Sequence, residues 1–163
     1  MQGLPAAQNN LATCLQAGNG VGKNEREAVR LYRLAANQGH AGAQNNYGEC
    51  VRNGIGLPKN ESEAMVFFQR AAGQGFALGQ LNLGLCFEHG TGTPKNMHEA
   101  VRWYRLAAAQ GLALAQRDLG WCYENGNCVS KNDTKVSTHV ASGTRQLAER
   151  VAIKATHALT SLY

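Results

Sequence analysis

The sequence contains no long apolar run. None of its windows approaches about 18 uninterrupted apolar residues, the length that a membrane-spanning helix needs. The first five residues, Met1-Gln2-Gly3-Leu4-Pro5, also lack the charged and apolar regions of a secretory signal peptide. We therefore expect no membrane insertion.

Paired cysteines and clustered histidines are missing as well. The five cysteines are an odd number with no Cys-x-x-Cys pair, which fits neither a disulfide framework nor a zinc ribbon. The five histidines share no repeating position and form no His-x-x-x-His pattern. We expect no metal or cofactor, and a reducing compartment, the cytoplasm, is favoured.

Catalytic motifs are absent too. The chain contains no Ser-x-x-Lys, no Gly-x-Ser-x-Gly and no phosphate-binding loop. Its net charge of +5 is modest, and its basic residues are dispersed without aromatic residues placed for base stacking. These features favour neither an enzyme nor a nucleic-acid-binding protein.

The chain does contain a repeat of 36 residues, and no insertion disturbs the spacing. The recurring positions include Gln8, Gln44, Gln80 and Gln116; Gly18, Gly54, Gly90 and Gly126; and Asn24, Asn60, Asn96 and Asn132. A period of this length indicates an array of stacked structural units.

Each unit predicts two helices, A and B. The apolar stripe of helix A falls at helical spacing, in the first two units at Ala7, Leu11, Cys14, Leu15 and at Ala43, Tyr47, Cys50, Val51. The glycine that follows can close the helix in the left-handed conformation, and the Gly-x-Gly loops add freedom to turn.

Helix B begins with a pattern that resembles a capping box. Asn24, Asn60 and Asn96 are each followed three residues later by a glutamate. The buried stripe follows at Ala28, Leu31, Tyr32, Ala35; at Ala64, Phe67, Phe68, Ala71; and at Ala100, Trp103, Tyr104, Ala107. A Gln-Gly pair then ends each helix.

One helix pair cannot bury its own apolar face, so neighbouring units must stack. Small residues permit close approach, at Gly48, Gly84, Gly120, Ala36, Ala72 and Ala108. The prediction is an all-α fold, a right-handed α-α superhelix with a concave side that the A helices line.

The expected boundaries follow the period. Residues 1–4 match the end of a preceding helix B, so we expect Met1 to be an imposed start. Residues 5–40, 41–76 and 77–112 form repeats 1 to 3, and residues 113–144 form a degenerate fourth repeat in which Lys135 replaces the capping glutamate. Residues 145–163 are expected to form a capping helix or, alternatively, a partly disordered tail.

Ala-Gln-Asn-Asn-x-Gly, Gly-x-Gly, Glu-Ala-Val-Arg-Trp-Tyr-Arg-Leu-Ala-Ala and Gln-Gly together resemble the Sel-1-like repeat, a relative of the tetratricopeptide repeat. The resemblance covers residues 2 to about 132. It implies an adaptor or scaffold with a partner-binding surface on its A helices.

By analogy with tetratricopeptide repeats, a ladder of A-helix positions would face the groove. These are Asn9, Asn45, Leu81 and Arg117; Asn10, Asn46, Asn82 and Asp118; and Thr13, Glu49, Leu85 and Trp121. An amide side chain offers both a donor and an acceptor to a peptide backbone. Structural hydrogen bonds within or between repeats are the alternative.

Leu81, Leu85 and Trp121 are expected to form an apolar patch on this otherwise polar face, of the kind that peptide grooves use. The alternative is that the C-terminal helix covers Trp121 and turns the patch into core.

The cysteine column, Cys14, Cys50, Cys86 and Cys122, is predicted to be buried thiols. Equivalent atoms of neighbouring repeats lie on the order of 10 Å apart, beyond disulfide reach. Cys128 could pair with Cys122 under oxidation.

We expect a non-enzymatic, monomeric or weakly self-associating scaffold that binds a protein or peptide. Two alternatives stay open. A cysteine-rich bacterial branch of the family implies β-lactam binding or hydrolysis, although that branch carries two cysteines per repeat. A chaperone-type clamp for a peptide terminus is the other.

Overall fold

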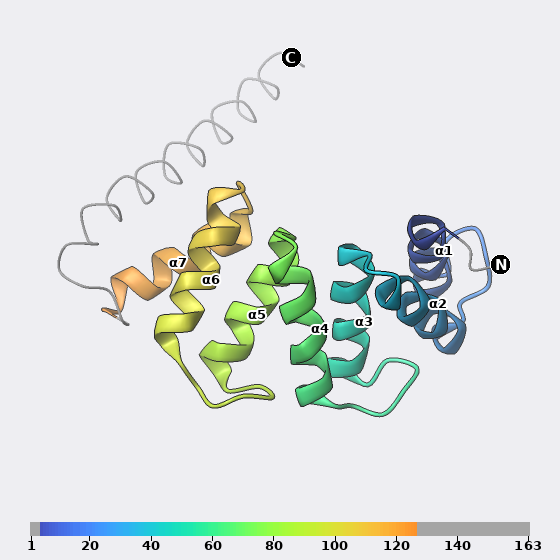
Figure 1. The fold of residues 1–163 in the computed structure, drawn as a ribbon, viewed down its shortest axis with the longest axis horizontal. Helices are drawn as coiled ribbons and strands as arrows, with labels where there is room; N and C mark the ends of the chain where they lie inside the picture. The colour runs from blue at the N-terminus through green and yellow to red at the C-terminus, as the bar shows by residue number, and fades with distance from the viewer. Residues whose placement is uncertain (1–3, 127–163) are drawn as a thin grey trace, which may run out of the picture.

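The computed structural model describes residues 4–126, which form seven α-helices and no strand (Figure 1). The helices are α1 (Pro5–Ala17), α2 (Glu25–Asn37), α3 (Ala41–Asn53), α4 (Glu61–Gly73), α5 (Ala77–His89), α6 (Met97–Ala109) and α7 (Ala113–Glu124). Odd-numbered helices are the predicted A helices and even-numbered ones the B helices. None of these helices is long and apolar enough to cross a membrane.

Helix α2 begins where the asparagine pattern predicts. The Asn24 side chain accepts a hydrogen bond from the Glu27 backbone N–H at 3.1 Å, and α4 and α6 begin in the same way. The reciprocal half of a capping box is not formed, because the Asn24 backbone N–H donates to the Leu15 carbonyl of α1 at 2.8 Å. Asn60 and Asn96 make the equivalent bonds. Each of these asparagines therefore starts helix B and ties it to helix A.

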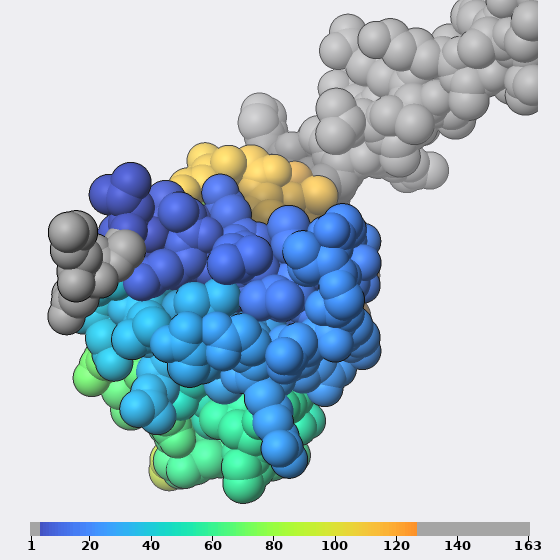
Figure 2. Space-filling model, turned by 90° about the vertical axis from the view of Figure 1, so that its right-hand side faces the viewer, coloured from blue at the N-terminus to red at the C-terminus, as the bar shows by residue number. Residues whose placement is uncertain are grey.

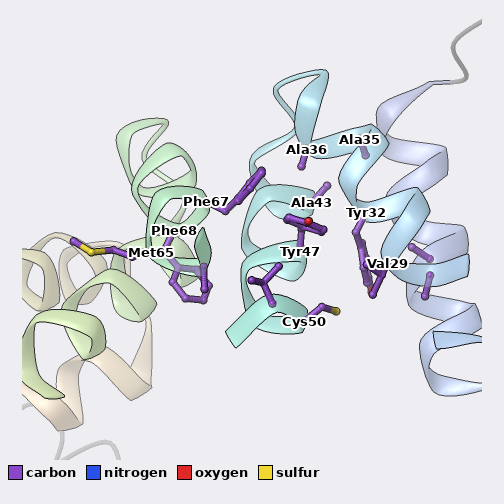
Figure 3. Packing of buried hydrophobic residues seen from close by; sticks show 14 of the residues in the cluster. Val29, Tyr32, Ala35, Ala36, Ala43, Tyr47, Cys50, Met65, Phe67 and Phe68 are labelled. Carbon is purple, nitrogen blue, oxygen red and sulfur yellow. The ribbon is translucent and has the colours of Figure 1, made fainter. Parts of the chain in front are cut away.

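Aromatic rings and glycines fit together between the two helices of a repeat. The Tyr47 and Phe67 rings of α3 and α4 pack edge to face, 4.6 Å apart (Figure 3). A Cβ added to Gly48 would lie 2.7 Å from the Phe68 ring, and one on Gly84 would lie 2.5 Å from the Tyr104 ring. Glycine at this position lets the helix axes approach as predicted; at Gly120 the added atom would meet nothing.

The stack curves with the A helices on its inner side. Helix α3 packs against both α1 and α5, whereas no comparable contact joins α2 to α4 or α4 to α6 within the described residues. Since α1, α3 and α5 lie closer to one another than α2, α4 and α6 do, the A helices line the concave surface (Figure 1). The fold is the predicted all-α solenoid.

In the second and third repeats, the second glycine of the Gly-x-Gly loop seats the loop on the preceding repeat. Gly56 has φ of +70°, and a Cβ there would lie 2.7 Å from the carbonyl oxygen of Glu25 at the start of α2. A Cβ at Gly92 would clash with Glu61 of α4 in the same way. These loops are thus part of the interface between repeats. From the sequence, their glycines are expected to supply only the conformational freedom that a turn needs.

Paired glutamines join helix ends across the stack. The Gln74 amide of α4's end donates to the Gln44 side-chain oxygen at 2.7 Å, and the Gln44 amide donates to the Ala36 carbonyl at 3.2 Å. The pairs Gln38 with Gln8 and Gln110 with Gln80 repeat the first bond. The recurring glutamines therefore have a structural role.

The predicted stripe of the first helix is wrong at two positions. Ala7 and Leu11 are exposed in the structure, whereas their counterparts Ala43 and Tyr47 are buried. The difference arises because α3 packs against α2, whereas no helix precedes α1 among the described residues. Trp103 is half-buried rather than buried.

Three members of the cysteine column are buried, as predicted, and the first is not fully buried. Cys50, Cys86 and Cys122 lie in the core and Cys14 is half-buried; Cys14, Cys50 and Cys86 form no disulfide. Cys128 lies outside the described residues.

Burial raises the pKa of the Cys50 and Cys86 thiols to about 11. An unfolded thiol titrates near 9.0, so the folded state binds more protons above that pH. The free energy of unfolding should therefore hold below pH 9 and fall as pH rises toward about 11. Urea midpoints measured at pH 8, 9 and 10 test this, and a C50A/C86A variant should show a flatter fall. A wild-type midpoint unchanged at pH 10 would contradict the prediction.

Candidate protein-interaction surface

The concave surface is the inner face of α1, α3, α5 and α7. The structure exposes some of the predicted site residues there, namely Asn10, Thr13, Arg117 and Trp121. Others are half-buried, namely Asn9, Asn46, Glu49, Leu85 and Asp118. Asn45, Leu81 and Asn82 are buried.

The asparagines form a ladder between successive A helices. The Asn46 amide of α3 donates to the Asn9 side-chain oxygen of α1 at 3.0 Å. One repeat further, the Asn82 amide of α5 donates to Asn45 at 2.9 Å. The next step lacks an amide, because Leu81 stands in the column of Asn9 and Asn45. These asparagine amides therefore make structural hydrogen bonds between repeats, which is the alternative to binding a peptide backbone.

Asn82 is the centre of a buried polar network. Its amide also donates to the Glu49 carboxylate at 2.9 Å, and Arg52 donates to its side-chain oxygen at 3.2 Å. Buried polar groups are stable only when they are hydrogen-bonded in this way. The amides of Asn45 and Asn82 are thus engaged by the protein itself.

The predicted apolar patch is divided. Leu81 is 5% exposed and packs in the core with α6 and α7, and Leu85 is half-buried against the same core. Trp121 is 49% exposed on α7. The expectation that Leu81 is an exposed member of the patch is wrong, because its column lies at the junction of successive repeats.

Three further residues at the edge of this surface were not predicted. Gln16, Arg52 and Glu88 occupy one column, and each contacts the aromatic ring sixteen residues further along. The Tyr32 hydroxyl donates to the Gln16 side-chain oxygen at 2.9 Å, and the Tyr104 hydroxyl donates to the Glu88 carboxylate. The middle repeat has phenylalanine and arginine instead, with the guanidinium 5.3 Å from the Phe68 ring centre.

This column could have been found in the sequence. Where the aromatic residue carries a hydroxyl, its partner accepts a hydrogen bond, and where it does not, the partner is a cation. Burial and the Glu88 carboxylate both raise the pKa of the Tyr104 hydroxyl, which stays a donor.

The concave surface has more acidic than basic groups. The A helices carry Glu49, Glu88, Asp118 and Glu124, against Arg52 and Arg117. Arg52 is held by the Phe68 ring and Asn82, and Arg117 pairs with Asp118 at 2.8 Å. The lysines of the described residues, Lys23, Lys59 and Lys95, all lie in loops.

Many outer basic groups are paired with glutamates of the same repeat. Arg30 pairs with Glu27 at 2.7 Å and Arg102 with Glu99 at 3.3 Å, both on B helices. Lys23 and Lys59 pair with the glutamates that begin α2 and α4. Exposed pairs of this kind add little stability and leave a mixed, solvated surface.

Comparison with known proteins agrees with this architecture. The sequence pattern described as "Sel1 repeat" matches residues 5–40, 41–76, 77–112 and 113–135. The chain belongs to the Sel1 repeat family. Sel1 repeats generally serve as protein-interaction scaffolds. No curated protein sequence matches this Sel1 repeat chain significantly.

Two solved Sel1-type structures are similar. The crystal structure of a Sel1 repeat protein from Oxalobacter formigenes is 40% identical, with a TM-score of 0.75 over 83% of this chain. The crystal structure of c5321, a protective antigen of uropathogenic Escherichia coli with an SLR fold, is 26% identical, with a TM-score of 0.57 over 91% of this chain. This chain spans 54% and 38% of those two chains, respectively.

Proposed function

We propose that this Sel1 repeat chain is a non-enzymatic scaffold that binds a protein or peptide on the concave surface. The observation that carries the proposal is Trp121, which is 49% exposed on an A helix, whereas Tyr32, Phe68 and Tyr104 are buried. Exposed tryptophan beside arginine is typical of residues that dominate binding energy. Arg117 and Asp118 lie within one turn of Trp121 on α7.

The polar part of the surface supports a partner with polar or positive groups. Asn10 and Thr13 are exposed on α1, and Glu49 and Asp118 are half-buried acidic groups on α3 and α7. Charge complementarity of this kind guides partner choice more than it adds affinity. The binding residues proposed here are therefore the accessible ones: Asn9, Asn10, Asn46, Glu49, Leu85, Arg117, Asp118 and Trp121.

A clamp for a peptide terminus needs amides on neighbouring helices that are available to the peptide. Asn45 and Asn82 both donate to Glu49, and Asn82 also donates to the Asn45 side-chain oxygen, so their amides are already engaged. This arrangement favours a general protein-binding groove over a clamp. We propose that the chain itself is monomeric or only weakly self-associating.

A peptide array probed with the full chain tests the proposal. Trp121→Ala should weaken the array signal of the bound peptides about tenfold or more, as expected for an interface anchor. Leu106→Ala removes a similarly exposed apolar side chain from α6, a B helix, and serves as the matched control. Both variants should keep the urea midpoint of the parent.

Two results would count against a concave binding surface. One is the retention of all peptide signals by Trp121→Ala. The other is an equal loss in Trp121→Ala and Leu106→Ala, which would place the binding elsewhere or show it to be nonspecific.

A further inference from the structure

The junction between α5 and α7 differs in charge from the junction between α3 and α5. In the earlier junction, Arg52 of α3 donates to the Asn82 side-chain oxygen of α5 at 3.2 Å. Glu88 and Asp118 follow in the same two columns one repeat later, so one carboxylate replaces the guanidinium and a second replaces the amide. The α5–α7 junction lies at the opposite end of the described stack from α1 and α2, which face the viewer in Figure 2.

The two carboxylates lie near the same hydroxyl group and keep oxygens to spare. The Tyr104 hydroxyl donates to the Glu88 carboxylate, and burial, Glu88 and Asp118 all raise the pKa of that hydroxyl. Arg117 reaches Asp118 twice, but both contacts are to the same oxygen, Oδ1, at 2.8 Å. Since an ionised carboxylate accepts on both of its oxygens, one oxygen of each carboxylate has no partner within residues 4–126.

Each of these helices also places an apolar side chain three residues from its carboxylate. Leu85 precedes Glu88 on α5, and Trp121 follows Asp118 on α7; residues three apart lie on the same face of a helix. Leu85 is half-buried, whereas Trp121 is exposed. A basic side chain, with a long apolar stem and a charged end, matches this combination of groups.

Four aromatic rings of this protein each have an arginine of the same chain over them. The guanidinium carbon atoms lie between 5.0 and 5.8 Å from the ring centres of Phe67, Phe68, Trp103 and Tyr123. No arginine within residues 4–126 lies over Trp121 in this way. Tryptophan is the aromatic side chain that attracts a cation most strongly. The exposed ring of Trp121 is therefore suited to an arginine from outside the chain.

We propose that the partner at the concave surface presents an arginine side chain to α5 and α7, an inference that rests on the proposed function. Its guanidinium donates to Glu88 and Asp118, and its stem packs on Leu85 and Trp121. Arginine fits better than lysine, because its planar guanidinium has five donors in a fixed geometry and is more weakly hydrated than an ammonium. Arg52 shows that a guanidinium can lie between successive A helices of this stack.

The test uses labelled peptides selected on the array because they bind the full chain and lose binding to Trp121→Ala. In each peptide, arginine is replaced by lysine or by citrulline, which keeps the shape of the arginine side chain but carries no charge. Fluorescence anisotropy should show that citrulline weakens binding to the full chain about tenfold or more, because it removes charge-assisted hydrogen bonds. Lysine should weaken binding as well, because it lacks the planar set of donors.

A double variant of the chain locates the contact. Glu88→Gln keeps an oxygen that can accept from Tyr104, and Asp118→Asn introduces the residue that this column has in the first three repeats. With both changes, the arginine and citrulline peptides should differ in affinity by less than about twofold. Glu63→Gln is the matched control, because Glu63 also accepts from a buried tyrosine, Tyr47, but lies on α4, a B helix. This control should leave the preference for arginine unchanged.

Failure of the arginine contact and failure of the proposed function give different results. The arginine contact alone would be refuted if the Trp121-dependent peptides lacked arginine, if citrulline or lysine left their affinity unchanged, or if the double variant kept the full preference for arginine. The absence of any Trp121-dependent peptide would refute both. A dimer of the parent chain that the double variant dissociates, measured by sedimentation velocity, would assign the arginine to a second copy instead of a separate partner.

Discussion

Replacing Gly92 by alanine should lower the free energy of unfolding by about 3 kcal/mol, the sum of a left-handed backbone penalty of about 1–2 kcal/mol and a steric clash of similar size. Gly92 has φ of +71°, and its added Cβ would clash with the backbone of Glu61 at the start of α4. Backbone at a helix start cannot move aside as the end of a flexible side chain can. Urea denaturation followed by circular dichroism measures the change.

Gly20→Ala is the control for this experiment. Gly20 has the same φ of +71°, but no atom lies within 4 Å of the position that the new Cβ would take. The variant should therefore lose only the backbone part, about 1 kcal/mol. If Gly20→Ala and Gly92→Ala lowered the free energy of unfolding equally, the cost would come from the left-handed backbone alone. That result would contradict a steric contact between Gly92 and the preceding repeat.

Asn82→Ala should destabilise the protein by about 2–3 kcal/mol, because it leaves buried polar partners without their hydrogen bonds. The Asn82 side chain bonds Asn45, Glu49 and Arg52, and Asn45 is itself buried. Without the Asn82 side chain, the Asn45 side-chain oxygen loses its hydrogen-bond donor and the Arg52 guanidinium loses an acceptor.

The matched variant is Asn46→Ala, one repeat earlier in the same column. Asn46 is half-buried and donates a single hydrogen bond to Asn9, which water can replace. Its loss should cost about 0.5–1 kcal/mol. Equal costs for Asn46→Ala and Asn82→Ala in urea denaturation would show that the network around Asn82 adds nothing beyond the ladder bond.

The period and the helix pairs were predictable from the sequence because they are encoded locally. Asn24, Asn60 and Asn96 begin helices where their spacing from glutamate indicates, and Gly18, Gly54 and Gly90 end helices in the left-handed conformation. Apolar stripes at helical spacing predicted which faces of the interior helices are buried.

The exceptions lie where a contact partner is not local in sequence. The stripe on α1 was expected to be buried at Ala7 and Leu11, because periodicity reports which face a helix would bury and not whether a neighbour is present. The reciprocal hydrogen bond of the capping box, which does not form, is a second exception of this kind. The Asn24 backbone N–H has a better acceptor in the Leu15 carbonyl of α1, which only the folded hairpin brings within reach.

The concave surface was predictable as a set of columns but not as a set of accessible groups. The predicted columns lie on the A helices, yet Asn45, Leu81 and Asn82 are buried between successive repeats. Their neighbours in the same columns, such as Asn10 and Arg117, are exposed because they lie near an end of the described stack. Exposure in a repeat protein depends on position along the array, which a single repeat cannot reveal. Lys135 and residues 145–163 lie outside the described residues.

The seating of Gly56 and Gly92 on Glu25 and Glu61 fixes the length of the short loops that follow α3 and α5. Loops on a protein surface ordinarily tolerate insertions, but one extra residue here would lift the loop from the helix below and misplace the helix that it leads into. Adding or removing a whole repeat would preserve this seating, whereas inserting a single residue in either loop would not. The unbroken 36-residue spacing along this chain is what that constraint would leave behind.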